Sequence, residues 1–506
     1  MSAYVTLPSD TNQALGIGRY AVDMLAGRFD PPGEQVLARL EQFHLDSAAC
    51  AVSAIACGTN APTLLRNEAL QYAYETAGGR RATCYGSSVG VAPEKAVVAN
   101  CAAVREWDAN GTNFGYNPDR GATAGEFGHN DFYPVAIAAA QLSGLDGRQT
   151  LLGMLVIDEL RGRLAEVFSL KDYKIDHVLH GAIASAAVYG ALRGATPEQI
   201  ESALGLLVAH YIPFRAIRAG RQLSDSKGAS AAISAEMAVL SVRRAMNGFA
   251  GPADVFRNPQ AVFCLFQPPG RDDCSPFDLT LTTSGDDFAV MGMHFKLGLY
   301  EHQSAGAIDA LVRLIVANPW LLQDPDDIQQ IVVQVYEPAF GIICDPAKRD
   351  PRTRQSADHS MVYILATLLR KAIQQGRAGW KELMLMPSDY DANALTDAQT
   401  RKLMEIIQVE HGGPQYDEKY PDGIPTSVEI TCGKGGRLSS GLVMYPPGHA
   451  RNSTADLDDL LEYKIRALAG LGTDDVDAMR ERFTNLSAKT AADIAQSNSF
   501  PIRGVV

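Results

Sequence analysis

The sequence lacks the features that would tie it to a membrane or a nucleic acid. No stretch approaches the roughly 18 uninterrupted apolar residues that a membrane-spanning helix needs. Among its 506 residues, 58 acidic side chains outnumber 45 basic ones, giving a net charge of −13. That balance argues against general binding to nucleic acids or membrane surfaces. Residues 1–13 show no basic segment followed by an apolar one, so we expect no secretory signal and a cytoplasmic location, or a mitochondrial one in a eukaryote.

Several catalytic signatures are absent as well. None of the 8 cysteines forms a C-x-x-C pair, which argues against zinc ribbons, redox dithiols and the iron–sulfur cluster of aconitase-type hydro-lyases. The sequence has no G-x-G-x-x-G, no Walker loop, no G-x-S-x-G and no H-E-x-x-H. Nucleotide cofactors, serine hydrolysis and zinc peptidase chemistry are therefore not indicated.

Most of the chain shows helical periodicity. A length of 506 residues is too great for one simple core, so two domains are the default and three are possible. Between residues 133 and 247 nearly all of the pattern is helical, rich in alanine and leucine. Helices are predicted at 11–26, 34–57, 67–76, 93–106, 133–142, 149–168, 175–193, 197–210 and 229–246.

The pattern changes beyond residue 290, where strands join the helices. Residues 328–336 are rich in β-branched side chains, and strands at 427–432 and 438–445 flank the turn 433–436. Helices are predicted at 304–317, 361–378 and 397–407, and the tail is helical again at 455–471 and 474–495. We therefore expect a mainly α protein: a large helical domain from 1–290 and 447–506, and a smaller α+β domain from 291–446.

The segment 101–132 contains the most informative loop. A helical run ends at Asp108, the Asn110-Gly111 pair breaks it, and a loop of about fifteen residues follows before the next apolar helix. Asp108, Thr112 and His129 lie on this loop. An active-site floor and an ordinary surface connection both fit this pattern.

A basic cluster follows the helix predicted at 197–210. Arg215, Arg218 and Arg221 recur every three residues, and Lys227 follows. Arginine side chains bind carboxylates in a bidentate manner, so the cluster suits a small di- or tricarboxylate. The alternative is a solvated basic face.

Two further segments carry groups able to move protons. Lys296 and His302 lie at the expected domain junction, where a lysine among apolar neighbours can anchor an anion or act as an acid or base. Asp358, His359 and Tyr363 lie at the start of the helix predicted at 361–378. Surface positions for Lys296 and His302, and a helix-capping role for Asp358, are the alternatives.

Six short motifs in a fixed order resemble those of the MmgE/PrpD family, which includes 2-methylcitrate dehydratase, cis-aconitate decarboxylase and an iminodisuccinate epimerase. The resemblance covers nearly the whole chain. The motifs are D-x-x-x-T at Asp108 and Thr112, G-H at Gly128-His129, R-x-x-R with lysine at Arg215, Arg218 and Lys227, F-K…H at Phe295-Lys296 and His302, D-H-S…Y at Asp358 to Tyr363, and Y-P-x-G-H-A-R around Gly448.

The resemblance implies a fold, a reaction and a set of roles. It implies an α+β lid over a helical domain, an active site in the cleft, a homodimer, and no metal or organic cofactor. The implied activity is a lyase acting on a small anionic di- or tricarboxylate, above all dehydration of 2-methylcitrate, with cis-aconitate decarboxylation or epimerisation as alternatives. The implied catalytic residues are Asp108, His129, Lys227, Lys296, His302 and Tyr363, and the implied substrate-binding residues are Thr112, Arg215, Arg218, His359 and Gly448.

Two departures from the family pattern concern the substrate. The loop between Thr112 and His129 is longer than expected. The segment from Lys296 to His302 is shorter than in the dehydratases and closer to the decarboxylase in spacing. A rival of another class is a carboxylate-binding protein that kept the fold without the activity.

Overall fold

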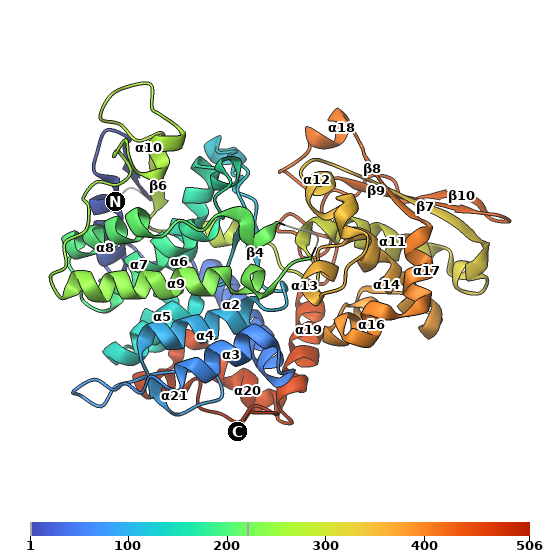
Figure 1. Cartoon of the computed structure of the whole chain (residues 1–506). Helices are drawn as coiled ribbons and strands as arrows, with labels where there is room; N and C mark the ends of the chain where they lie inside the picture. The colour runs from blue at the N-terminus through green and yellow to red at the C-terminus, as the bar shows by residue number, and fades with distance from the viewer. Residues whose placement is uncertain (1–2, 220–221, 506) are drawn as a thin grey trace.

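A large helical body carries the first half of the chain (Figure 1). The computed structural model describes residues 3–219 and 222–505. The helices of this body are α1 (Gln13–Leu25), α2 (Glu34–Ala56), α3 (Asn60–Ala69), α4 (Pro93–Arg105), α5 (Tyr133–Ser143), α6 (Gly147–Val167), α7 (Val178–Leu192), α8 (Pro197–His210), α9 (Asp225–Met246) and α10 (Val262–Phe266). Most of the predicted helices are confirmed to within a few residues.

The helix predicted at 67–76 is wrong. Helix α3 instead begins at Asn60 and ends at Ala69. The segment that follows is hydrogen-bonded to an extended segment near Gly90. The Tyr74 amide donates to the Gly90 carbonyl at 3.0 Å, and the Ala92 amide donates to the Tyr72 carbonyl at 2.8 Å. A tertiary partner therefore replaces the local helical bonds.

Helix α7 lies at the centre of the body and is almost wholly buried. It contacts α6, α8 and α9, and small residues allow these close approaches. At Gly181, an added Cβ would come within 2.0 Å of the Phe132 ring. The alanine-rich composition of this region thus reflects tight helix packing.

The N-terminal strand makes a pairing that the sequence did not indicate. Strand β1 (Tyr4–Leu7) runs antiparallel to β6 (Leu279–Thr282), with Tyr4 opposite Thr282. Because nearly the whole helical body separates the two strands in sequence, no local pattern could have predicted this register.

A second body contains the four-stranded sheet (Figure 1). Its strands are β7 (Ile328–Val335), β8 (Ile407–His411), β9 (Thr426–Cys432) and β10 (Gly436–Ser439), in the order β10-β9-β7-β8, with β7 parallel to β8 and antiparallel to β9. Its main helices are α11 (Ala305–Ala317), α14 (Met361–Gln375) and α17 (Ala398–Glu405).

Most predicted elements of this body are confirmed, but its edges differ. The strand predicted at 438–445 ends at Ser439, because Gly441 adopts a left-handed φ of 65° and turns the chain. Strand β8 was missed because its five residues follow α17 almost directly, and a short apolar run after a helix resembles that helix's last turn.

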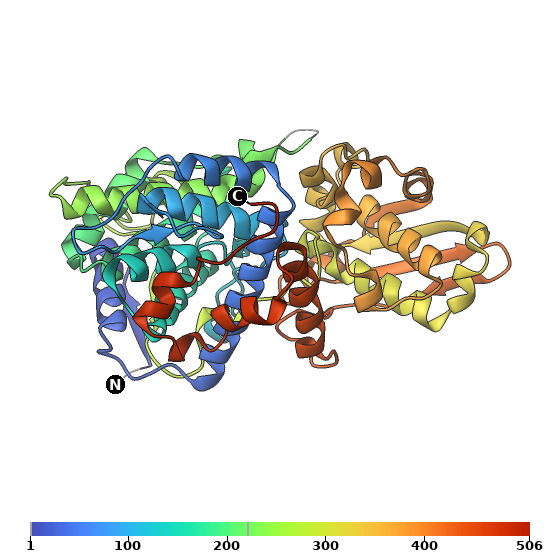
Figure 2. The ribbon, with the colours of Figure 1, turned by 90° about the horizontal axis from the view of Figure 1, so that it is seen from below.

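The C-terminal tail returns to the helical body, as Figure 2 shows. It forms α19 (Leu457–Gly472), α20 (Val476–Phe483) and α21 (Ala491–Gln496). Helix α19 packs on α2, and a buried ion pair joins Lys464 Nζ to Asp46 Oδ1 at 2.6 Å. Lys464 also donates to the Ala109 carbonyl at 2.6 Å, so the tail holds the backbone next to Asp108.

Within the described ranges, no single helix has both the length and the apolar character to cross a membrane. Only α2 and α3, bent at 89°, meet that test as a pair by length and composition.

Candidate active site

The loop after α4 is closed at its base by a short antiparallel ladder. Strand β4 (Thr112–Asn113) pairs with β5 (Gly128–His129), which places Thr112 directly opposite His129. The Thr112 hydroxyl donates to the Gly128 carbonyl at 2.9 Å. The segment between them is anchored by Arg120, whose guanidinium binds Asp287 at 2.8 Å. The loop is therefore built into the fold.

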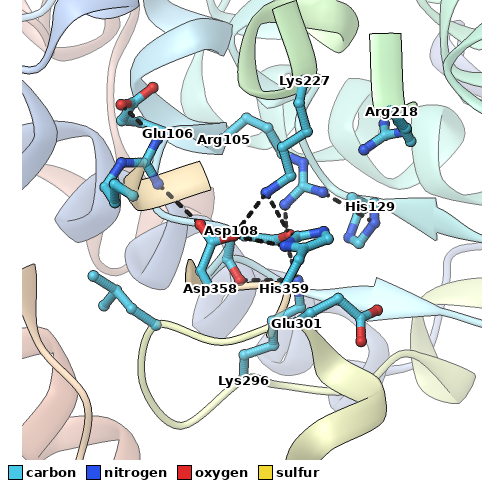
Figure 3. Close-up of polar contacts among 12 residues, drawn as sticks. Arg105, Glu106, Asp108, His129, Arg218, Lys227, Lys296, Glu301, Asp358 and His359 are labelled. Atoms are coloured by element: carbon cyan, nitrogen blue, oxygen red, sulfur yellow. Dashed lines mark hydrogen bonds and ion pairs between the residues drawn. The ribbon is translucent and has the colours of Figure 1, made fainter. Parts of the chain in front are cut away.

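Asp108 is the centre of a buried charge cluster (Figure 3). It has a left-handed φ of 52° and lies just beyond the end of α4. That carboxylate accepts hydrogen bonds from Arg105, Lys227 and Lys296, the Lys227 bond being 2.9 Å long. Burial raises the pKa of Asp108, but Arg105, Lys227 and Lys296 together outweigh that effect and hold the pKa well below its usual range.

A second acid, Asp358, joins this cluster from the segment before α14. Its Oδ1 lies 3.4 Å from Lys227 Nζ and 2.6 Å from His359 Nδ1. Its Oδ2 accepts from Arg354 at 3.0 Å. Lys227 therefore links Asp108 to Asp358, and α9 to the segment before α14.

His359 is a neutral imidazole held by a carboxylate. Burial and then Lys227 lower the pKa of His359 to about 4, against the opposing effect of Asp358. Since Nδ1 donates to Asp358, Nε2 carries the lone pair, and Nε2 lies 3.4 Å from Asp108 Oδ2. A neutral imidazole in this tautomer can accept a proton.

His129 is also neutral. Burial, followed by Arg105 and Lys296, lowers its pKa well below the usual range. Its Nε2 lies 3.3 Å from Arg105 Nη2. A guanidinium can only donate, so Nε2 accepts and Nδ1 carries the proton. That buried Nδ1 has no hydrogen-bond partner in the described part of the chain.

These groups surround a cavity of about 340 Å³. Basic and imidazole side chains form one part of its wall, and Phe114, Phe127, Leu223 and Ile342 form an apolar part. The predicted site residues that line it are Asp108, Thr112, His129, Arg215, Arg218, Lys227 and His359. The lining thus combines basic and imidazole side chains with apolar ones, a composition that suits a small carboxylate.

The remaining predicted residues lie behind the cavity wall. Lys296 is completely buried beneath Asp108, where its Nζ also donates to the Asp108 carbonyl at 2.9 Å, and burial lowers its pKa to about 8. His302 is buried with its ring centroid 5.4 Å from that of Phe114. The Tyr363 hydroxyl donates to the Asp389 carbonyl at 2.7 Å, and burial raises its pKa to about 12.

Gly448 supports the site through the backbone. Its φ is 89°, and its carbonyl accepts from the Phe295 amide at 2.8 Å. An added Cβ would come within 2.3 Å of the Phe295 carbonyl oxygen. Gly448 therefore fixes the backbone immediately before Lys296.

Replacing Gly448 by alanine is expected to destabilise the protein more than the left-handed backbone alone would. That conformation costs a non-glycine residue roughly 1–2 kcal/mol, and the clash with Phe295 adds to it. Gly441 is the matched control, because it has a φ of 65° and nothing within 4 Å of an added Cβ. Urea unfolding of Gly448→Ala and Gly441→Ala measures the difference, and equal losses would contradict the packing argument.

The two arginines of the basic cluster that the structure describes differ in their partners there. Arg218 forms a bidentate pair with the buried Asp176, which leaves it little capacity for a ligand. Arg215 Nη1 is buried and has no hydrogen-bond partner among the described residues. Burial lowers the pKa of Arg215 despite Asp176. The third predicted member, Arg221, lies outside the described residues.

Several cavity residues were not anticipated from the sequence. They are Arg105, His177, Glu301, Asp345 and Lys348. Arg105 could have been found, because it lies one helical turn before Asp108. No motif residue marks the other four: Glu301 lies beside His302 within the F-K…H segment, and the other three lie outside the six motifs. Within the described residues, no group of three or more His, Cys, Asp or Glu side chains could hold a metal ion.

The structure is that of a mainly helical protein with a cavity lined by residues of both bodies of the chain. Family models of the MmgE/PrpD N-terminal and C-terminal domains match residues 19–269 and 300–488. The chain belongs to the MmgE/PrpD family.

Curated relatives of this chain are named 2-methylcitrate dehydratase. The Escherichia coli protein is 24% identical over 325 residues, which cover 63% of each chain. The Salmonella typhimurium protein is 24% identical over 337 residues, 65% of each chain. The mitochondrial protein of Yarrowia lipolytica is 24% identical over 341 residues, 65% of this chain and 61% of the relative. The matched segment thus spans less than two thirds of these relatives' length.

Proposed function

We propose that this chain is a cofactor-independent hydro-lyase that dehydrates 2-methylcitrate or a related β-hydroxy tricarboxylate. The observation that carries the proposal is the cavity itself. Lys227, Arg215 and the neutral imidazole of His359 all line it, and Arg215 Nη1 has no hydrogen-bond partner among the described residues. Cations to bind carboxylates and neutral bases to remove a proton are what such an elimination needs.

The chemistry explains why both kinds of group are required. The proton to be removed is α to a carboxylate and only weakly acidic. As it leaves, negative charge builds on that carboxylate, and fixed cations stabilise this charge more in the transition state than in the ground state. Arg215 and Lys227 supply such cations, while His359 Nε2 offers a lone pair oriented by Asp358.

We assign Asp108 the task of holding the cations in place. Its low pKa and its bonds to Arg105, Lys227 and Lys296 make it a poor proton acceptor. Lys296 supports Asp108 from beneath, and Thr112 closes the ladder that carries His129. His302, Tyr363 and Gly448 support this constellation from behind the wall.

The proposed arrangement includes a lid and a dimer. In it, residues 1–290 and 447–506 form the helical domain, residues 291–446 form the lid, and the substrate binds between them. We propose a homodimer in the cytoplasm, or in mitochondria of a eukaryote. Light scattering on the purified protein tests the dimer directly.

The reaction is tested by product analysis. The enzyme is incubated separately with 2-methylcitrate, citrate, cis-aconitate and iminodisuccinate, and products are followed by NMR. An alkene formed with loss of water supports the proposal. Release of carbon dioxide, or inversion of iminodisuccinate without loss of water, would replace it by decarboxylation or epimerisation, and no change in any substrate would favour a carboxylate-binding protein.

Replacing Lys227 by methionine is expected to lower kcat by about 100- to 1,000-fold, the usual effect of removing one group that stabilises developing negative charge. Lys95→Met is the matched control. Lys95 forms ion pairs with Glu68 and Glu236 away from the cavity, so it tests the loss of a paired lysine alone. Steady-state kinetics on folded enzyme provides the comparison, and equal rates for both variants would remove Lys227 from the mechanism.

A further inference from the structure

The carboxylates at the cavity differ in how they are paired. Asp108 and Asp358 are each bound by several cationic or imidazole groups. Glu301 also lines the cavity, yet it forms no ion pair with any residue that the structure describes. A carboxyl group that is not neutralised by a cation is free to exchange a proton.

The backbone around Glu301 fixes its position. Its amide donates to the Asp358 carbonyl at 2.8 Å, which ties it to the segment that carries His359. Its Oε2 accepts from the Gln303 amide at 2.8 Å and so caps the short turn His302–Ser304. Figure 3 shows its carboxyl group directed away from Asp108 and free of the interactions that join the cluster. One oxygen is therefore anchored, while the group as a whole faces the cavity.

The residues next to Glu301 carry an unusual number of unpaired polar atoms. Both ring nitrogens of His302 and both side-chain polar atoms of Gln303 are buried without a hydrogen-bond partner in the described structure. Tyr336 and Tyr420 stack with ring centroids 4.5 Å apart, and their buried hydroxyls are unpaired too. Buried polar groups are rarely left unpaired without a reason, and a catalytic role is one such reason.

The buried position of Glu301 favours its protonated form. Burial and then Asp108 raise the pKa of Glu301 to about 7, while Lys296 and Lys227 oppose them. The pKa values of His129 and His359, which also line the cavity, are lowered instead, so both imidazoles stay neutral. Pairs of groups whose environments push their pKa values apart divide the roles of acid and base.

We propose that Glu301 is a further catalytic residue, the general acid whose carboxyl proton leaves with the substrate's hydroxyl group. This role rests on the proposed dehydration. The neutral imidazole of His359 takes, at Nε2, the proton from the carbon α to the carboxylate, and the C–H electron pair becomes the new C=C bond. The C–O bond breaks, and the departing oxygen keeps its electron pair and takes the proton of Glu301, so that water leaves. The imidazolium and the Glu301 carboxylate that remain return to their starting forms by passing one proton from the first to the second.

The test compares Glu301→Gln with the wild type. Glutamine keeps the oxygen that accepts from the Gln303 amide but cannot donate a carboxyl proton. We expect kcat to fall by about 100- to 10,000-fold, with KM changed far less. In the wild type, kcat should fall as the pH rises above about 7, because the general acid loses its proton. That descending limb should vanish in Glu301→Gln and persist in Glu301→Asp, which keeps an ionisable carboxyl group.

Glu337→Gln is the matched control. Glu337 also accepts a backbone amide, that of Gly341 at 3.3 Å, but it is exposed to solvent. Its replacement should leave kcat and the pH profile unchanged. If Glu301→Gln kept full turnover or the descending limb, the acid role would be refuted while the dehydratase proposal stood. A wild type inert toward every tricarboxylate would refute both.

Discussion

Replacing Asp108 by asparagine is expected to lower the free energy of unfolding by about 3–5 kcal/mol and to abolish turnover. Removing one partner from a buried ion pair leaves the other charge uncompensated, and that loss has this magnitude. Here Arg105, Lys227 and Lys296 would all lose their shared carboxylate. Asparagine tolerates a left-handed backbone, so the change isolates the charge from the φ of 52°.

Asp273→Asn is the control for this substitution. Asp273 has a φ of 56° and is exposed, so the same change of residue type occurs in the same backbone conformation without burial. Its effect should stay within about 0.5 kcal/mol, as for most surface substitutions. Urea unfolding at pH 7.5 measures both variants. A loss below 1 kcal/mol for Asp108→Asn would mean that the cluster does not need its central charge.

Lowering the pH from 7.5 to 5.5 is expected to remove several kcal/mol of stability. Burial lowers the pKa values of eight histidines: His44, His129, His177, His180, His294, His302, His359 and His449. Below pH 6.5 these histidines bind protons in the unfolded chain but stay neutral in the folded chain. Their contribution to stability is therefore fully present above pH 6.5 and is lost as the pH falls toward about 4. Each such histidine contributes roughly 1.3 kcal/mol over the interval.

The buried acids act in the opposite direction. Burial raises the pKa values of eight of them: Asp46, Glu106, Glu126, Asp131, Asp158, Glu166, Glu301 and Asp309. The pKa values of Glu126 and Glu301 reach about 7, so these two acids gain protons within the interval and favour the folded state there. The eight histidines outnumber these two acids, and the net effect is destabilising. Urea titrations at several pH values provide the measurement, and unchanged stability at pH 5.5 would refute the prediction.

One substitution measures how much of the loss of stability between pH 7.5 and 5.5 comes from His302 alone. His302 stacks on His294 with centroids 5.2 Å apart, and neither of its nitrogens is hydrogen-bonded in the described structure. His302→Phe should therefore reduce the loss between pH 7.5 and 5.5 by about 1.3 kcal/mol. His411→Gln is the control, a change of a histidine at an exposed position beside Asp417.

Much of the helical fold was accessible to sequence analysis because its signals are local. The helix Pro197–His210 begins with a capping box at Thr196 and Gln199, and it was predicted with the right bounds. Pairings over long distances in the chain were not accessible. Strand β1 with β6, and the extended contacts that replace a helix near Tyr74, depend on partners that no local pattern names.

Site residues that belong to a motif could be predicted from the sequence. Residues that join the site only because the fold places them at the cavity could not. The motif residues Asp108, Lys227 and His359 do converge. Motifs could not reveal that Tyr363 bonds the Asp389 carbonyl or that Arg218 is occupied by Asp176. Nor could they reveal that Glu301 faces the cavity, since its neighbour His302 is the residue that the motif marks.

By itself, the sequence determined the helical character, the family and several of the charged residues around Asp108, among them Lys227 and Lys296. Periodicity, capping and short motifs depend only on neighbours along the chain. Only the tertiary structure decided which charged side chains pair with one another and which face the cavity. The reason is physical: a buried charge must find a partner, and the fold decides whether that partner is another side chain or a bound substrate. Asp108 is satisfied by three cations of the chain, whereas Arg215 Nη1 has no hydrogen-bond partner and Glu301 no ion pair among the residues that the structure describes.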